Sequence, residues 1–456
     1  MPAMAQNIRN YSIARLAWPI FLQMLLSLCL GYADTAMVSR YSDTAVGAIG
    51  NASQLLGFLM LAFTIISSAT GVVVAQYLGA GQDSQMNRIY TVALSFNLAL
   101  SVLLCAAVAA FCRPLLALLN VPAVMRDEAA AYMRIVGCFL SANALISVFF
   151  QIFNCNGKTY LGTILVFSMN VMNIIGNYVF LYGPLSFLGL GTTGVAISTS
   201  ASSVIGVVTA YICFRTVIGG RISVRLLAPF PRGILAKLVR LGIPTAGENI
   251  SYNISQICIT TFANLLGPTA ITTKIYCAIL CGFSMVYSNS VAGATAIITG
   301  HSVGGGDDDF AARRVMKSLA SAAAVSLCLA ALNWRLSRHT LRLFTDNAGI
   351  LALGSRVMFI AIFLELGRTL NLVVIQSMRA AGDVVFPTAL GIASMWGISV
   401  VLAWTLGIRL GLGLEGIWIG MAADEIFRGA VVLIRWKSGA WRGKSVVGGS
   451  AEGGEQ

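Results

Sequence analysis

Long apolar runs without a single charge recur along this 456-residue chain. No Asp, Glu, Lys or Arg occurs in residues 44–82 or in residues 159–214. A helix needs about 20 mainly apolar residues to cross a bilayer, so the second run has room for two helices. Gly183-Pro184 supplies the turn between them. The pattern predicts an all-α polytopic membrane protein.

Counting such stretches predicts twelve transmembrane helices, six in each half of the chain. They span residues 13–38, 50–77, 89–112, 130–153, 160–182, 190–213, 240–264, 276–300, 317–335, 353–377, 386–406 and 415–434. The chain then divides into an N-terminal six-helix lobe (1–213), a cytoplasmic linker (214–239), a C-terminal six-helix lobe (240–436) and a tail (437–456). The Gly- and Ser-rich composition of the tail predicts disorder.

The two halves repeat each other at an offset of 225 residues. Arg15-Leu16-x-x-Pro19 returns as Arg240-Leu241-x-x-Pro244, and Gly79-x-Gly81-x-Asp83 returns as Gly304-x-Gly306-x-Asp308. A repeated hydrophobic half of this length is typical of secondary transporters. Proline inside a helix removes a backbone hydrogen bond and permits a kink. We therefore expect Pro19 to act as a hinge in the first helix.

The composition agrees with a membrane protein: 57% of the residues are hydrophobic and 10% are charged, against about 25% charged in soluble domains. The net charge of +13 does not indicate nucleic-acid binding, because the basic residues concentrate in segments expected on the cytoplasmic side. This bias predicts a multi-pass protein of the plasma (inner) membrane with both termini cytoplasmic. No phosphate-binding loop and no metal-ligand spacing of Cys or His occurs, so we expect no enzyme activity and no cofactor.

Asp34 is the clearest candidate site residue. It lies deep in the first predicted helix, and its counterpart in the second half is Ile259. Ionisable residues inside a membrane are costly and are functional candidates by default. Asp34 is predicted to exchange a proton or hold a small cation, unless it lies at the outer end of the helix and is simply solvated.

The fifth and sixth predicted helices carry polar side chains. Asn173 and Asn177 are four residues apart and therefore share a helix face, and Thr199 lies in the next helix. Amides and hydroxyls in such helices also serve as interhelical contacts, so the residues alone leave both interpretations open.

The second half carries a different polar set. Glu248 follows Pro244 in the seventh predicted helix, and Glu365 precedes Arg368 by three residues in the tenth. This set predicts either an ion pair that fixes packing or a polar chamber for substrate binding or gating.

At these residues the chain resembles the multidrug and toxic compound extrusion (MATE) family of efflux transporters. Asp34-Thr35-Ala36-Met37-Val38 is similar to the family's Asp-Thr-x-Met-Val motif. Gln76-Tyr77-Leu78-Gly79-Ala80-Gly81 is similar to the signature that closes the second helix. Arg379-Ala380-Ala381-Gly382-Asp383 resembles the turn after the tenth helix. The similarity covers nearly the whole chain apart from the tail.

The resemblance implies a cation-coupling site in the first half. Asp34 matches the family's coupling carboxylate, and Asn173 and Asn177 match its fifth-helix Asn-x-x-x-Asp/Asn pair. Thr199 falls in the small-residue and threonine motif of the sixth helix. Asn177 stands where many members carry a second carboxylate, so this site would hold one formal charge. Arg368 lies near the position of a tenth-helix aspartate in some members, which argues against a cation site of that kind there.

The family resemblance implies an antiporter that exports organic, often cationic, compounds by alternating access. The coupling ion would be a proton or Na⁺ at Asp34, and the single carboxylate favours the proton. The partners would be small-molecule substrates and the lipid bilayer, with the protein acting as a monomer. Two alternatives stay open. One is a flippase for lipid-linked saccharides from the same broader superfamily, in which Arg368 and Arg428 would serve a phosphate head group. The other is a membrane scaffold that transports nothing.

Overall fold

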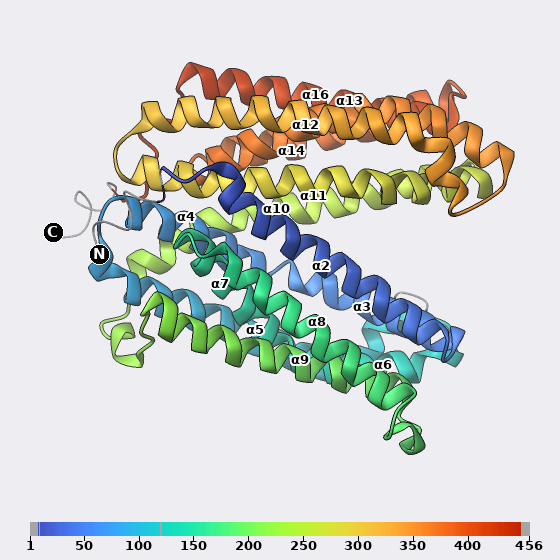
Figure 1. The fold of residues 1–456 in the computed structure, drawn as a ribbon, viewed down its shortest axis with the longest axis horizontal. Coiled ribbons are helices and arrows are strands. Elements are labelled where there is room, and N and C mark those ends of the chain that lie inside the picture. The colour runs from blue at the N-terminus through green and yellow to red at the C-terminus, as the bar shows by residue number, and fades with distance from the viewer. Residues whose placement is uncertain (1–7, 9, 119–120, 448–456) are drawn as a thin grey trace. The chain divides into compact units, whose positions relative to one another are not determined.

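The computed structural model describes residues 8, 10–118 and 121–447 as helices joined by short loops (Figure 1), and these residues contain no strand. The helices of the first half are α2 (Ile13–Ser39), α3 (Asp43–Met60), α4 (Phe63–Gly79), η1 (Asp83–Gln85), α5 (Met86–Leu118), α6 (Ala123–Cys138), α7 (Leu140–Cys155), α8 (Thr159–Leu181), η2 (Ser186–Leu188) and α9 (Gly191–Cys213). Two short turns follow, η3 (Phe214–Ile218) and η4 (Val224–Leu227). The second half contains α10 (Arg232–Leu265), α11 (Pro268–Gly304), α12 (Asp308–Arg342), α13 (Ala348–Ala380), α14 (Val385–Ser394), η5 (Met395–Val400), α15 (Val401–Trp404), η6 (Thr405–Arg409) and α16 (Gly413–Ser438).

The predicted polytopic helical fold is confirmed. In the described part of the chain, eight helices are long and apolar enough to cross a membrane, and two bent pairs add two further spans. The pairs are α3 with α4, bent by 44°, and α6 with α7, bent by 48°. The two remaining predicted spans coincide with α10 and α16. Both carry buried charged residues, among them Glu248 and Asp424, which lower their hydrophobicity.

Contacts divide the chain into two compact units. The N-terminal unit contains Leu22–Val74 and Gln82–Gly242, and the C-terminal unit contains Met1–Phe21, Ala75–Gly81 and Ile243–Gln456. The first helix of each half is therefore shared. α2 passes from one unit to the other just after Pro19, and α10 does so just before Pro244.

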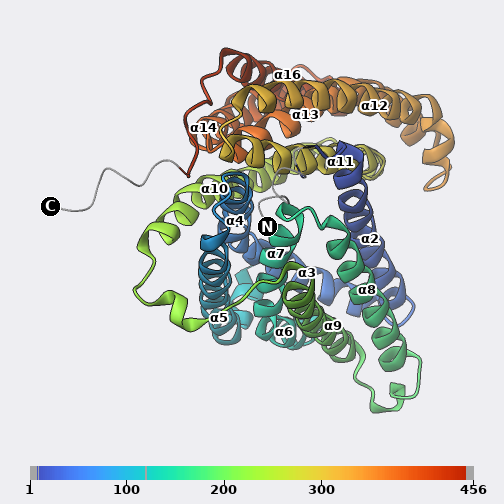
Figure 2. The ribbon, with the colours of Figure 1, turned by 60° about the vertical axis from the view of Figure 1, so that its left-hand side comes forward.

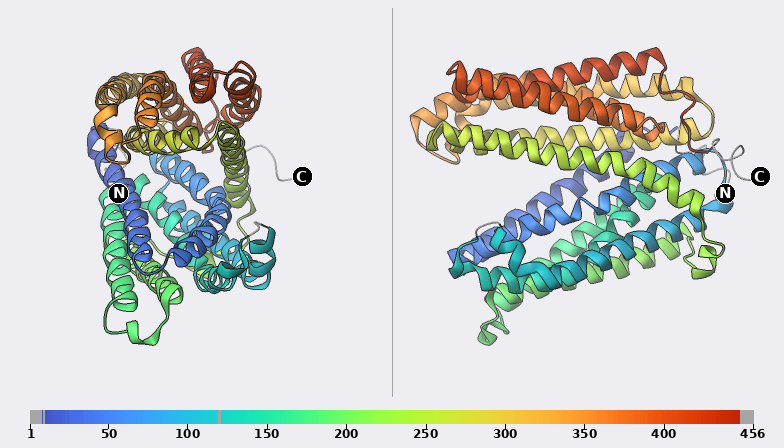
Figure 3. Two further views of the ribbon diagram at one scale, coloured as in Figure 1. Left: turned by 90° about the vertical axis from the view of Figure 1, so that its right-hand side faces the viewer. Right: turned by 180° about the vertical axis from the view of Figure 1, so that it is seen from behind.

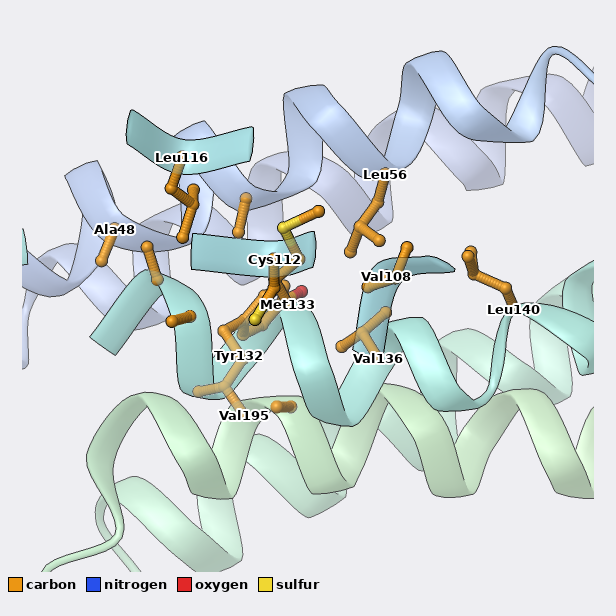
Figure 4. Packing of buried hydrophobic residues seen from close by; sticks show 14 of the residues in the cluster. Ala48, Leu56, Val108, Cys112, Leu116, Tyr132, Met133, Val136, Leu140 and Val195 are labelled. Carbon is orange, nitrogen blue, oxygen red and sulfur yellow. The ribbon is translucent and has the colours of Figure 1, made fainter. Parts of the chain in front are cut away.

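The N-terminal unit has its apolar core around α6. Tyr132, Met133 and Val136 of this helix are buried among side chains of α3, α5 and α9 (Figure 4). Their spacing of three and four residues places Tyr132 and Met133 one helical turn from Val136, on the face that meets these helices. α8 packs along α9 in the same unit (Figure 2). The core therefore fixes α9 and, through it, α8.

The C-terminal unit is built around α13, which packs against α11, α12 and α16 (Figures 1 and 3). Its apolar core includes Val357, Met358 and Leu364 of α13 together with Ile417 and Trp418 of α16. Because α13 is surrounded by helices on several sides, polar residues along it are also buried. This explains how charged groups come to lie inside this unit.

The segment between the halves is attached to the N-terminal unit. The backbone N–H of Arg221 donates to Asn87 Oδ1 at 2.8 Å, and Arg88 Nη2 donates to the carbonyl of Pro229 at 3.0 Å. α10 begins at Arg232, inside the range 214–239 expected to be a linker. Pro231 biases Phe230 away from helical geometry, so the helix starts only after this proline.

The repeated glycines allow a close crossing of α4 and α11 within the C-terminal unit. A Cβ atom on Gly304 would collide with the backbone of Gln76, and a Cβ atom on Gly79 would collide with the backbone of His301. Gln76 and His301 are themselves 225 residues apart, as Gly79 and Gly304 are. The repeat therefore places equivalent residues on both sides of one contact between α4 and α11. The two backbones can come this close only because glycine has no side chain.

The chain after α16 packs back onto the C-terminal unit, and we call residues 439–447 the C-terminal strap. Trp441 stacks on Trp436 with ring centroids 4.1 Å apart and planes 5° apart, and its indole N–H donates to the Trp436 carbonyl at 2.9 Å. Lys444 Nζ lies 2.6 Å from Asp383 Oδ1, and the strap also bonds to Gln76 Oε1. The prediction of a disordered tail from residue 437 is thus wrong for 437–447, because Trp441 buries a large apolar surface. Residues 448–456 of that prediction lie outside the described residues.

Replacing Trp441 with alanine should detach the strap and lower the melting temperature of the purified protein. Removing a buried tryptophan side chain typically costs about 3–5 kcal/mol. Thermal unfolding followed by tryptophan fluorescence would measure the shift. Trp18→Ala is the matched control, because Trp18 is 65% exposed. Equal melting temperatures for Trp441→Ala and the wild type would show that the strap contributes nothing to stability.

Candidate functional site

Asp34 lies on α2, in the N-terminal unit, where its side chain contacts α8. Asn177 Nδ2 donates to Asp34 Oδ1 at 2.7 Å, and Asn177 is completely buried. Two turns earlier along both helices, Asn170 Nδ2 donates to the carbonyl of Leu26 at 2.7 Å. Asparagine amides of α8 therefore bind α2 at two points, one a carboxylate and the other a backbone carbonyl.

The same amide network continues to α9. Asn177 Nδ2 also lies 3.2 Å from Asn173 Oδ1, and Asn173 Nδ2 donates to Thr199 Oγ1 at 3.1 Å. The hydroxyl of Ser198 donates to the Asn173 carbonyl at 2.8 Å, which fixes α8 against α9. The four residues predicted from the sequence as the cation-coupling set are thus neighbours in one chain of hydrogen bonds.

Tyr132 of α6 joins this site, and the sequence reasoning missed it. Its side chain lies near Ser53 of α3 and Thr199, and the charge of Asp34 is part of its electrostatic surroundings. A lone phenol in the alanine-rich stretch Ala129-Ala130-Ala131 could have drawn attention to this position. Its hydroxyl can donate or accept a hydrogen bond, so it extends the polar network to a fourth helix, α6.

The chemistry of this site is that of oxygen atoms and amides around one carboxylate. Asn177 Oδ1 is buried and has no hydrogen-bond partner among the described residues. Across residues 8, 10–118 and 121–447 no group of three or more His, Cys, Asp and Glu side chains could hold a metal ion. Ligands of this kind suit a proton or a hard cation bound through oxygen, rather than a transition metal.

A second polar region lies in the C-terminal unit, as a cavity of about 240 Å³. We call it the polar chamber. Its lining comes from α10, α11, α13, η5 and α16. The lining residues are Glu248, Asn249, Tyr252, Met285, Asn289, Arg368, Asn371, Leu372, Ile375, Gln376, Arg379, Met395, Glu425 and Arg428.

The charged residues of the polar chamber are paired. Arg368 bonds to Glu365 one turn earlier on α13, which confirms the proximity expected from their spacing. Glu248 bonds to Arg379, the first residue of the turn motif noted in the sequence. Arg428 Nη2 lies 3.0 Å from Asp424 Oδ2 and 3.3 Å from Glu425 Oε1.

The ion pairs in and around the chamber contain four carboxylates and three guanidinium groups: Glu248, Glu365, Asp424 and Glu425 with Arg368, Arg379 and Arg428. Of these, Glu365 and Asp424 do not line the cavity. The sequence leaves open whether Glu248, Glu365 and Arg368 form an ion pair that fixes packing or a polar chamber. Glu248 and Arg368 line the cavity, whereas Glu365 pairs with Arg368 without lining it. The partnership of Arg379 with Glu248 was missed, because 131 residues separate them.

Arg428→Leu should destabilise the protein strongly. Removing one partner of a buried ion pair leaves an uncompensated charge and costs about 3–5 kcal/mol, which corresponds to a fall in melting temperature of about 5–15 °C. The double variant Arg428→Leu, Asp424→Leu should recover part of this loss. Arg356→Leu is the control, because Arg356 pairs with Glu415 at an exposed position where a pair contributes about 0–1 kcal/mol. Equal melting curves for the two single variants would contradict the prediction.

The model of a family described as MatE matches residues 19–179 and again 244–405. The chain is 35% identical over 439 residues to "Uncharacterized transporter YisQ" of Bacillus subtilis, covering 96% of each chain. It is 22% identical over 448 residues to "Probable multidrug resistance protein NorM" of Thermotoga maritima, covering 95% and 94%. A crystal structure of MATE in a bent conformation matches with a TM-score of 0.89 at 18% identity, covering 95% of this chain and 97% of that one.

Proposed function

Because this chain belongs to the MatE family of multidrug and toxic compound extrusion transporters, we propose that it exports small organic compounds in exchange for a cation. The compounds are mainly cationic, and export crosses the plasma (inner) membrane with both chain termini in the cytoplasm. The observation that carries the proposal is Asp34, a carboxylate inside α2 held by the buried amide of Asn177. An ionised carboxylate inside the membrane costs free energy, so a carboxylate in such a position is a candidate for function.

The coupling step is a change of charge on Asp34. While Asp34 is ionised, it accepts a charge-assisted hydrogen bond from Asn177, which is roughly twice as strong as a neutral one. Binding of a proton removes that charge and weakens the link between α2 and α8. Two other hydrogen bonds to α2, from Asn170 to the Leu26 carbonyl and from the hydroxyl of Tyr182 to the Met37 carbonyl, have no charge to lose. The part of α2 around Asp34 is then held less tightly and can bend, with Pro19 as its hinge.

The proton is the preferred coupling ion. Asp34 is the one carboxylate of the network that it forms with Asn173, Asn177 and Thr199. Na⁺ stripped of water needs several oxygen ligands, and the amide oxygens of this network would have to supply most of them. A proton needs only the carboxylate. The chemistry of this site therefore allows either ion to bind, and binding of the proton requires fewer rearrangements of the surrounding side chains.

Purified protein in liposomes tests this proposal directly. A fluorescent organic cation should cross the membrane when a proton gradient is imposed, and a sodium gradient of equal size should drive less movement. Protein-free liposomes under the same gradients are the control. Movement driven by sodium alone would reverse the choice of ion. No movement with either gradient, together with an envelope defect in a deletion strain, would instead support a lipid-linked saccharide flippase.

A further inference from the structure

The polar chamber of the C-terminal unit contains buried hydrogen-bonding groups without partners. Arg379 Nε and Arg428 Nε are buried N–H donors that find no acceptor among the described residues. Arg428 is 6% exposed, and Arg379 and Arg428 both line the cavity. A guanidinium group has five N–H donors, and the ion pairs with Glu248, Asp424 and Glu425 use only part of them. The chamber therefore offers donors for an anionic group.

The same chamber also offers acceptors for a cationic group. Two carboxylates, Glu248 and Glu425, line the cavity beside the three guanidinium groups. The amide oxygen of Asn371, 3% exposed, has no donor within the described part of the chain. Buried polar groups of either kind are unfavourable unless a partner satisfies them.

We propose that the polar chamber binds a small zwitterion, a molecule with an ammonium group and a carboxylate at amino-acid to dipeptide size. Its carboxylate accepts hydrogen bonds from Arg379 and Arg428. Its ammonium group donates to Glu425 and to Asn371 Oδ1. Met285 and Met395 of the lining contact the apolar part of the ligand, since thioether side chains adapt to varied shapes.

Molecules with one kind of charge fit this chamber less well. A simple cation faces the guanidinium groups of Arg368, Arg379 and Arg428, and like charges close together repel strongly where water is scarce. A simple anion is repelled by Glu248 and Glu425 and leaves the amide oxygen of Asn371 without a donor. A zwitterion adds no net charge and satisfies both sets of unpartnered groups. The cavity of about 240 Å³ sets the size limit.

This inference deepens the proposed function, because such a zwitterion would be a transport substrate. Its test is a binding measurement without any gradient, so it does not depend on coupling at Asp34. Transport of organic cations without zwitterion binding would overturn this inference and leave the proposed function standing. Zwitterion binding without transport of any compound would support this inference and overturn the proposed function.

The experiment compares three forms of one dipeptide on the purified full-length protein by isothermal titration calorimetry. Alanyl-leucine carries both charges, N-acetyl-alanyl-leucine carries only the negative one, and alanyl-leucine amide carries only the positive one. We expect the zwitterion to bind at least about 10-fold more tightly than either derivative, because each derivative leaves one set of buried groups unsatisfied. Equal binding of the amide would identify a cation site, equal binding of the acetylated form an anion site, and no binding of any form would overturn the proposal.

Conservative variants link the binding to the chamber. Arg379→Lys keeps the charge beside Glu248 but removes the planar N–H donors, so it should weaken zwitterion binding about 10-fold and leave amide binding little changed. Arg356→Lys, at the exposed pair with Glu415, should not change binding. Melting curves of both variants confirm that each is folded. Zwitterion binding unchanged in Arg379→Lys would place the ligand elsewhere.

Discussion

Asp34→Asn is expected to slow gradient-driven transport by about 10- to 150-fold while the protein still folds. Asparagine has nearly the same shape as aspartate, and its amide oxygen can still accept the hydrogen bond from Asn177. The variant cannot change its charge, so the α2–α8 link no longer responds to a proton. A hydrogen bond to a charged group contributes about 1.5–3 kcal/mol. If the strength of this bond no longer changes when a proton binds, the transport rate should fall by about 10- to 150-fold.

The measurement is substrate movement in liposomes under an imposed proton gradient, with Asp127→Asn as the matched control. Asp127 pairs with Arg113 at the surface of the same unit, where its side chain is 85% exposed. Asp127→Asn should transport like the wild type, and both variants should elute as the wild type does in size-exclusion chromatography. Undiminished gradient-driven transport by Asp34→Asn would remove Asp34 from the coupling step.

Gly304→Ala should have the second large effect, this time on folding. The added methyl group would collide with the backbone of Gln76, which cannot turn away as a flexible side chain can. α4 and α11 would have to separate, so the cost should exceed the 1–3 kcal/mol usual for overpacking. Gly79→Ala should act alike, because its methyl group would meet the backbone of His301.

Gly282→Ala, on the same helix α11, should have the opposite effect on stability. A Cβ at Gly282 meets no atom within 4 Å, and alanine favours a helix over glycine by about 1 kcal/mol. The melting temperature should therefore rise slightly in Gly282→Ala and fall sharply in Gly304→Ala. A similar melting temperature for the two variants would mean that the helices relax apart without cost.

Features that depend on local pattern were predictable from the sequence. Charge-free runs located the spans, and the repeat identified Gly79 and Gly304 as equivalent. The spacing of Asn173 and Asn177 placed both on one face of a helix, and family resemblance added Asp34 and Thr199 to the same site. These inferences needed only helix periodicity, bilayer thickness and motif order.

Features that depend on packing between distant segments were not predictable. No local pattern indicates that Glu248 meets Arg379, because the ion pair joins α10 to α13 and 131 residues separate its two members. The strap was missed because its glycines and serines suggested disorder. Trp441 was the contrary signal, since one large aromatic side chain can bury enough area to order a short segment.

The sharing of the first helices between the two units has a consequence for each half taken alone. The start of α2, up to Phe21, belongs to the C-terminal unit, and the start of α10, up to Gly242, belongs to the N-terminal unit. A half expressed by itself would have to exchange this segment with a second copy to complete its unit, as in a domain-swapped dimer. Because one chain here contains both halves, the two sequences can differ. Position 34 could keep an acid while its twin became Ile259.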